Sequence, residues 1–351
     1  MVPIPSEPGS GLSLDHLAAL FGVDDLAERL AAVDARLVDA LDGDGALLGR
    51  DSVRVAGTGG KRLRPLLTVV SAALGGTFDE RVVAAAAAVE LVQVGSLVHD
   101  DIIDGAATRR GRPTINAAAG LETALLAGDY ILARAAALAA EVSAEAAGVL
   151  AGALGDLCEG QVLEMRDAHD PGRSVDAYLA SVRGKTGALF SCACHLGALC
   201  GGLSDRNTLA LSRYGAAFGM GFQVLDDVLD VIGDAERMGK PTGTDIAGGV
   251  YTLPVLGALA GPDGDELRRL LEGPDTSPGA GALELVRRSG SLADALATAD
   301  RYDDEARRQV DHLNQTAVGE GLALFPRTYT TWALEQLMDR RYLAVPLTAP
   351  G

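Results

Sequence analysis

The stretch VVAAAAAVELVQVGSLVHDDIID, residues 82–104, decides the fold class of this 351-residue chain. Its run of alanines favours a helix strongly. A helix of 3.6 residues per turn places Asp100 and Asp104 on one face, so the two carboxylates point in the same direction. Carboxylates packed among apolar neighbours repel each other and lose hydration, so this motif needs a cationic partner.

A second stretch, GFQVLDDVLDVIGD at residues 221–234, repeats the arrangement. A solvated acidic helix face is the alternative interpretation, because the chain is acidic overall. Both motifs, however, lie within Leu, Ile and Val runs rather than among charged residues. The candidate metal ligands are Asp100, Asp101, Asp104, Asp226, Asp227 and Asp230.

Arginines follow the first aspartate motif, at Arg109, Arg110 and Arg112. Guanidinium groups bind phosphate oxygens bidentately. Hard carboxylate oxygens suit Mg²⁺, which often bridges one or two carboxylates to a substrate phosphate. Carboxylates, metal, diphosphate and arginines therefore form one coherent predicted site.

Other Ala-rich stretches, such as ILARAAALAAEVSAEAAGVLAGAL at 131–154, also favour helix, and the alternation typical of strands is scarce. We predict an all-α protein. No segment resembles a linker between two cores, so one domain is expected over residues 14–345. Residues 1–13 contain three prolines and several Gly and Ser, and we expect them to be disordered.

The net charge of −18 argues against nonspecific binding to nucleic acid or to anionic membranes. No charge-free apolar run approaches the length of a membrane span, since Asp129 and Arg134 interrupt one candidate, so no transmembrane segment is expected. The N-terminus lacks a basic start and an apolar core, so we expect no secretory signal and a cytoplasmic protein.

Further cations mark possible anion sites. Lys61 and Arg64 lie where a glycine-rich turn, GTGGKR, meets a predicted helix start, which suits an anion but also fits an exposed basic turn. Lys185 interrupts an apolar helix, where it needs an anionic partner unless its amine reaches solvent. Lys240 lies in MGKPTGTDIAGGVYTLPV, residues 238–255, a glycine-rich loop that resembles a lid.

Five motifs in this order resemble those of the trans-isoprenyl diphosphate synthases, also called polyprenyl synthetases. They are GGKRLRP at 59–65, DDIID with RRGRPTIN at 100–116, GKT at 184–186, FQVLDDVLD at 222–230 and GKPTGTD at 239–245. The resemblance spans roughly residues 55 to 258 and is highly specific. It implies a single large helical bundle of the isoprenoid synthase type with a deep central cavity, and a homodimer.

The resemblance also implies roles for the aspartates. Asp100 and Asp104 would bind two Mg²⁺ ions with support from Asp101. Asp226 would bind a third Mg²⁺, with Asp227 and Asp230 nearby.

The same resemblance assigns the remaining site residues to two substrates. The diphosphate of the allylic prenyl substrate would be held by Arg109, Lys185 and Lys240. The diphosphate of isopentenyl diphosphate would be held by Lys61, Arg64 and Arg110, with Gln93 beside them. Thr186 and Gln223 would line the reacting centre.

Product length should depend on the residues that precede Asp100 on its helix face, where the growing chain would descend. Those positions hold Ala88, Val92, Gly95 and Ser96. Relatives with short products carry aromatic residues at the two nearest positions, and none stands here. We therefore predict a hexaprenyl or longer product rather than geranylgeranyl. Alternatively, Gly95 and Ser96 only permit close helix packing, or another helix supplies a floor.

One departure from the family pattern is Val250, which replaces a lysine five residues after Asp245 and removes one diphosphate contact. A basic C-terminal segment found in some relatives is also not recognisable. A terpene cyclase of the same fold is an alternative, but it would not need Lys61, Arg64 and Arg110. A second alternative is a noncatalytic partner subunit of a heteromeric synthase, although such subunits tend to lose the aspartates.

Overall fold

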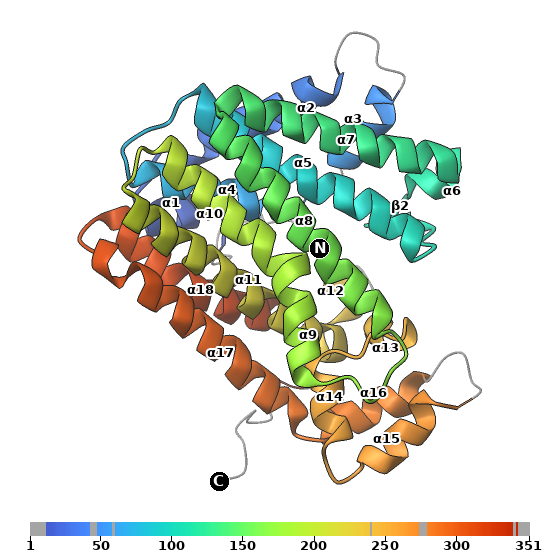
Figure 1. The fold of residues 1–351 in the computed structure, drawn as a ribbon. Coiled ribbons are helices and arrows are strands. Elements are labelled where there is room, and N and C mark those ends of the chain that lie inside the picture. Colours follow the sequence, from blue (N-terminus) through green and yellow to red (C-terminus); the bar gives the residue numbers. More distant parts are fainter. Residues whose placement is uncertain are drawn as a thin grey trace. The chain divides into compact units, whose positions relative to one another are not determined.

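The computed structural model describes residues 12–42, 48–57, 60–238, 241–273 and 279–339 together with Tyr342, with the backbone alone at 279 and 280. These residues are mainly helical, as Figure 1 shows, and their only strands are the two-residue β1 and β2. The prediction of an all-α protein is thus confirmed. The chain divides into two compact units, and the prediction of one domain over 14–345 stays a prediction.

Unit 1 comprises residues 1–155, 189–215 and 309–323. Its own elements are α1 (Leu14–Phe21), α2 (Leu26–Asp42), α3 (Gly49–Ala56), α4 (Leu63–Ala73), α5 (Glu80–Ile103), β1 (Thr108–Arg109), β2 (Arg112–Pro113), α6 (Ile115–Ala119), α7 (Leu121–Val142) and the 3₁₀ turn η3 (Asp311–Leu313). Leu12, 2% exposed, and Ser13, which caps α1, lie within the segment predicted to be disordered. The rest of that segment, 1–11, lies outside the described residues.

Helix α5 is the central helix of unit 1. Asp79 caps its N-terminus by accepting hydrogen bonds from the backbone N–H groups of Arg81 and Val82. Most of the residues from Val82 to Val98 are buried, so the helix is apolar on nearly every side. Glycines bring it close to α7: a Cβ added at Gly128 of α7 would lie 2.2 Å from the ring of His99.

A short hairpin follows α5. Strands β1 and β2 pair antiparallel, with Thr108 opposite Pro113 and Arg109 opposite Arg112. The two turn residues, Arg110 and Gly111, have φ angles of 52° and 72°. Positive φ at both central residues is the geometry of a type I′ turn, which matches the twist of the strands that it joins. The turn therefore places two arginines of the predicted site at the end of a rigid hairpin.

Unit 2 comprises residues 156–188, 216–308 and 324–351. Its own elements are α9 (Val175–Val182), the π-helical turn η2 (Arg183–Gly187), α12 (Ala235–Met238), α13 (Thr244–Ala247), α14 (Leu253–Leu259), α15 (Gly264–Leu271) and α16 (Gly279–Arg288). Helices that contribute residues to both units are α8 (Ala144–Arg166), α10 (Ala188–Cys200), α11 (Asp205–Ile232), α17 (Ser291–Val310) and α18 (Ala317–Leu337).

Aromatic side chains form much of the core of unit 2. Phe218 and Phe222 of α11 pack against Phe325 and Tyr329 of α18, with ring centroids 5.2 to 5.8 Å apart for the Phe218–Phe325, Phe218–Tyr329 and Phe222–Tyr329 pairs. Trp332 extends this cluster, 5.8 Å from Tyr329. The C-terminal end of α11, which carries the second aspartate motif, is therefore anchored by large apolar contacts.

Two helices, α5 and α7, are long and apolar enough to cross a membrane by length and composition alone. Isolated charges such as Asp129 and Arg134 leave the mean hydropathy of a long window high, and the expectation of no transmembrane segment stays a prediction. The apolar window of α5 is 78% buried, as in the core helix of a bundle. That of α7 is 39% buried, and its exposed face carries Leu121, Leu125 and Leu126.

Candidate active site

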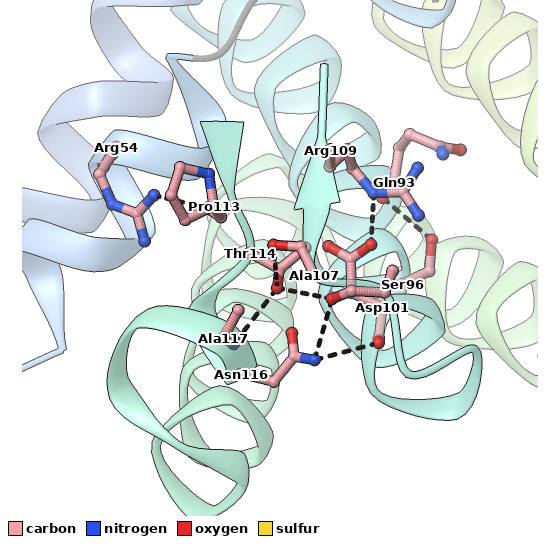
Figure 2. Close-up of polar contacts among 11 residues, drawn as sticks. Arg54, Gln93, Ser96, Asp101, Ala107, Arg109, Pro113, Thr114, Asn116 and Ala117 are labelled. Carbon is pink, nitrogen blue, oxygen red and sulfur yellow. Dashed lines mark hydrogen bonds and ion pairs between the residues drawn. The ribbon is translucent and has the colours of Figure 1, made fainter. Parts of the chain in front are cut away.

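The first aspartate motif lies at the C-terminal end of α5. Asp100 is half-buried, Asp101 is 4% exposed and Asp104, the C-cap residue, is exposed. The Arg109 Nε donates a hydrogen bond of 2.7 Å to Asp101 Oδ1, as Figure 2 shows. Burial raises the pKa of Asp101 above its ordinary value, and the Arg109 guanidinium opposes that rise. The middle aspartate thus orients Arg109, a predicted diphosphate-binding residue.

Two further side chains, not predicted from the sequence, fix the segment between α5 and α6. The Asn116 Nδ2 donates to the backbone oxygens of Asp101 and Ala106, at 3.3 and 3.1 Å. The Thr114 hydroxyl donates to the Ala106 oxygen at 2.7 Å and caps α6 by accepting from the Ala117 N–H. Figure 2 shows both residues beside Asp101. They hold the hairpin and its arginines in place.

A cationic cluster forms around Glu90 of α5. The Arg62 Nη1 donates to Glu90 Oε1 at 2.7 Å, and the Arg62 Nε lies 3.0 Å from Asp34. Arg64 lies 4.2 Å above the Phe190 ring, and its burial lowers its pKa to about 10, with Glu90 acting in the opposite sense. Burial also lowers the pKa of Arg110, and Glu90 again opposes the shift.

The glycine-rich turn before α4 approaches the hairpin. A Cβ added at Gly60 would lie 3.3 Å from the Arg110 guanidinium. Lys61 is 3% exposed and Arg64 is 7% exposed, so these two cations are not the exposed basic turn of the alternative interpretation. The structure therefore brings the turn that precedes Lys61 next to Arg110, and it adds Glu90, which the sequence analysis missed.

The second aspartate motif lies on α11 in unit 2. Asp226 is half-buried, whereas Asp227 and Asp230 are 3% and 1% exposed. Asp227 Oδ2 accepts a 2.5 Å hydrogen bond from the Tyr178 hydroxyl, and Asp227 Oδ1 accepts a 2.9 Å bond from Gln223 Nε2. Burial raises the pKa of Asp227 to about 7, against the lowering effect of these two donors.

Asp230 ties the following loop to the motif. Its Oδ1 accepts from the Thr244 hydroxyl at 2.6 Å, its Oδ2 from the Asp245 N–H at 3.2 Å, and its backbone oxygen from the Gly243 N–H at 2.7 Å. The motif therefore divides into Asp226, which is half-buried, and two buried carboxylates that accept hydrogen bonds from the protein.

Lys185 and Thr186 lie in the π-helical turn η2. A Cβ added at Gly160 of α8 would lie 2.3 Å from the Lys185 backbone nitrogen, so this glycine permits a close approach of the turn. The Lys185 Nζ lies 2.5 Å from Glu164 Oε1, which supplies the anionic partner that the sequence required but did not identify. The Thr186 hydroxyl donates to Gln223 Oε1 at 2.9 Å, so these two predicted residues are adjacent.

The described part of the glycine-rich loop predicted to act as a lid is hydrogen-bonded to other segments of unit 2. The Gly249 backbone oxygen accepts from the His169 N–H at 2.7 Å, and the Tyr251 oxygen accepts from Arg173 Nη1 at 3.3 Å. Val250, the departure from the family pattern, donates its N–H to the Asp245 oxygen. Lys240 lies outside the described residues.

The residues predicted to set product length are buried within unit 1. Ala88 and Val92 are 0% and 1% exposed, and the Ser96 hydroxyl donates to the Gln93 backbone oxygen at 2.9 Å. A Cβ added at Gly95 would lie 3.0 Å from the Leu132 side chain of α7. Gly95 therefore faces a neighbouring helix, as the close-packing alternative describes.

Within the described residues, no group of three or more His, Cys, Asp or Glu is placed to hold a metal ion by itself. The half-buried Asp100 and Asp226 and the exposed Asp104 still offer oxygens of the type that Mg²⁺ accepts. Mg²⁺ usually keeps several waters and binds one or two carboxylates together with substrate phosphates. The donor set therefore fits a metal that binds together with a diphosphate.

Comparison with known proteins identifies the class of this fold and site. The family model for polyprenyl synthetases matches residues 48–281. A nonaprenyl diphosphate synthase from Mycobacterium tuberculosis is 38% identical over 317 residues, which are 89% of each chain. A heptaprenyl diphosphate synthase component 2 from Geobacillus stearothermophilus is 36% identical over 82% of this chain and 91% of its own.

A solved structure agrees with these sequence relatives. The polyprenyl synthase from Caulobacter crescentus CB15, complexed with calcium and isoprenyl diphosphate, is 33% identical with a TM-score of 0.83, and the match covers 93% of this chain and 99% of that one. The chain belongs to the polyprenyl synthetase family. The resemblance drawn from the five motifs is thereby confirmed.

Proposed function

We propose that this protein extends an allylic prenyl diphosphate with successive isopentenyl diphosphate units to a hexaprenyl or longer trans product. The observation that carries the proposal is that cations gather at two different carboxylates of α5, Asp101 and Glu90. Arg109 is oriented by Asp101, and Arg64 and Arg110 gather around Glu90. Two diphosphates require two such groups, whereas a cyclase ionises only one substrate. The names of the nonaprenyl and heptaprenyl relatives support a long product.

In the reaction, Asp100, Asp104 and Asp226 would hold three Mg²⁺ ions. When bound, these ions stabilise the negative charge that develops on the departing diphosphate. The family resemblance assigns both Arg109 and Lys185 to that diphosphate, and Lys185 would then exchange its ion pair with Glu164 for the substrate. Lys61, Arg64 and Arg110 hold isopentenyl diphosphate, with Gln93 beside them on the adjacent face of α5.

The residues at the reacting centre are Thr186 and Gln223, which hydrogen-bond to each other. The hydrogen bonds that fix Gly243, Thr244 and Asp245 on Asp230 hold one side of the loop near this centre. We propose that this loop, with Lys240, keeps water away from the cationic intermediate, because water would quench it.

We also propose a homodimer. The exposed face of α7 carries Leu121, Leu125 and Leu126, each at least half exposed. Leucines gathered on one helix face mark an interaction surface more often than a solvated one. Sedimentation of the purified chain should give twice the monomer mass, and Leu125→Glu should shift it to the monomer.

The defining experiment is incubation of the pure protein with Mg²⁺, labelled isopentenyl diphosphate and each allylic starter from dimethylallyl to geranylgeranyl diphosphate. Dephosphorylated products are separated by chromatography. Labelled hexaprenyl or longer alcohols are expected. Accumulation of labelled geranylgeraniol would favour the alternative of a geranylgeranyl diphosphate synthase. Unlabelled cyclic hydrocarbons would refute the proposal of a synthase. Incorporation only after a second protein is added would identify a partner subunit, as the name "component 2" of one relative suggests for that protein.

A further inference from the structure

A continuous chain of hydrogen bonds in unit 2 ends at the reacting centre. It begins at Tyr178 of α9, which is 2% exposed. Its hydroxyl donates to Asp227, Asp227 accepts from Gln223 Nε2, and Gln223 Oε1 accepts from the Thr186 hydroxyl. The three donor–acceptor distances are 2.5, 2.9 and 2.9 Å. No role for Tyr178 was predicted from the sequence.

The chemistry of Asp227 sets the direction of this chain. Asp227 Oδ2 accepts from the Tyr178 hydroxyl and Asp227 Oδ1 accepts from Gln223 Nε2, so the amide nitrogen of Gln223 faces the carboxyl group. The amide oxygen of Gln223 then points to Thr186, and the Thr186 hydroxyl must donate to it. The Thr186 hydroxyl therefore donates its proton to Gln223, and the lone pairs of the Thr186 oxygen are left to accept hydrogen bonds from other groups. A rotated Gln223 amide would reverse this polarity.

Tyr178 is well placed to enforce that direction. Its O–H occupies Asp227 Oδ2, so only Oδ1 remains for Gln223. Arg173 lies 5.5 Å from the centroid of the Tyr178 ring and is itself held by the Ser181 hydroxyl at 2.5 Å and by the Tyr251 backbone oxygen at 3.3 Å. Arg173 is 7% exposed, so this support is part of the core of unit 2.

We propose that Tyr178 is a positioning residue for prenyl transfer, which acts through Asp227 to fix the orientation of Gln223 and Thr186. This inference rests on the proposed function. It concerns the reacting centre and not the binding of either diphosphate, so it predicts an effect on kcat and none on the KM for isopentenyl diphosphate.

The test is Tyr178→Phe, which keeps the ring and removes the hydroxyl. Because the variant loses a buried hydrogen bond to Asp227, kcat should fall on the order of tenfold, with the KM for isopentenyl diphosphate within about twofold of wild type. Tyr214→Phe is the matched control: it removes the hydroxyl of another fully buried tyrosine, outside this chain of hydrogen bonds, and should leave kcat unchanged. A Tyr178→Phe kcat within about twofold of wild type would overturn the inference.

A double variant separates positioning from general loss of stability. If Tyr178 acts only through the hydrogen-bonded chain, Tyr178→Phe should add at most about twofold to the loss caused by Thr186→Val alone. Losses that multiply would overturn the inference.

If Tyr178→Phe does not accumulate, Arg173→Lys leaves the tyrosine in place and removes the guanidinium beside its ring. Here kcat should fall by a smaller factor, and an unchanged kcat would count against the inference. Wild-type protein that incorporates no isopentenyl diphosphate would instead refute the proposed function, so the two failures are distinguishable.

Discussion

Replacing Asp303 by asparagine should make the protein more stable at neutral pH. Asp303 lies on α17, is 3% exposed and accepts a 2.8 Å hydrogen bond from the Thr330 hydroxyl of α18. A Cβ added at Gly221 of α11 would lie 3.1 Å from its Oδ1, so three helices surround the carboxyl group. Burial raises the pKa of Asp303 to about 6, and the Thr330 hydrogen bond only partly opposes that rise.

The magnitude follows from the two pKa values. The ordinary pKa is 3.8 and the folded-state pKa is about 6, a difference of about 2 units or about 3 kcal/mol. The folded state binds the proton more tightly than the unfolded state does. The free energy of unfolding therefore decreases as the pH rises from about 4 to about 6 and then levels off. Asparagine keeps an acceptor for Thr330 and carries no charge, so Asp303→Asn removes this decrease.

The assay is urea denaturation followed by far-UV circular dichroism between pH 5 and 7. The stability advantage of Asp303→Asn over wild type should grow by about 1 kcal/mol across this range, because most of the titration of the folded state occurs there. Asp304→Asn is the matched control, since it removes the same charge from a side chain that is 47% exposed. An advantage that does not change with pH, or a variant less stable than wild type at pH 7, would refute the reasoning.

Other predictions concern packing, metal and product length. Gly197→Ala should lower the free energy of unfolding by about 3 kcal/mol in urea titrations, because its Cβ would lie 2.2 Å from the Thr68 backbone oxygen. Gly148→Ala is the control: its Cβ would meet no atom within 4 Å, so it should raise the free energy of unfolding by about 0.5 kcal/mol. Asp226→Asn should lower kcat roughly a hundredfold in the labelled incorporation assay, and retained activity would remove it from the metal site. Chelation of divalent ions should abolish incorporation, and added Mg²⁺ should restore it. Gly95→Phe should lower the thermal midpoint without shortening the product, because the ring would displace Leu132; a shorter product from a stable variant would instead place Gly95 in the tunnel.

The helical content and the helix that carries the first aspartate motif were predictable, because alanine-rich runs and aspartate spacing act within one helix. The neighbours of that helix were not predictable from the sequence. Periodicity predicts which residues share a face with Gly95, but it does not say that Leu132 of α7 lies against that face.

The site shows the same limit. The sequence required an anionic partner for Lys185 but could not select Glu164, 21 positions away, from the many acidic residues of the chain. A signal existed for Glu90, which interrupts an apolar helical run as Lys185 does, but Glu164 lies among other polar and charged residues. Tyr178 gave no signal, because a tyrosine in an amphipathic helix is usually a core residue, and its contact with Asp227 depends on how α9 meets α11.

The aromatic cluster of unit 2 contains the only tryptophan of the chain, Trp332, which is 3% exposed. Its emission therefore arises from one known position, without any background from a second indole. Tyr329 links it to Phe222, the residue before Gln223. The protein thus carries a single optical reporter of the core that packs against the helix of its second aspartate motif.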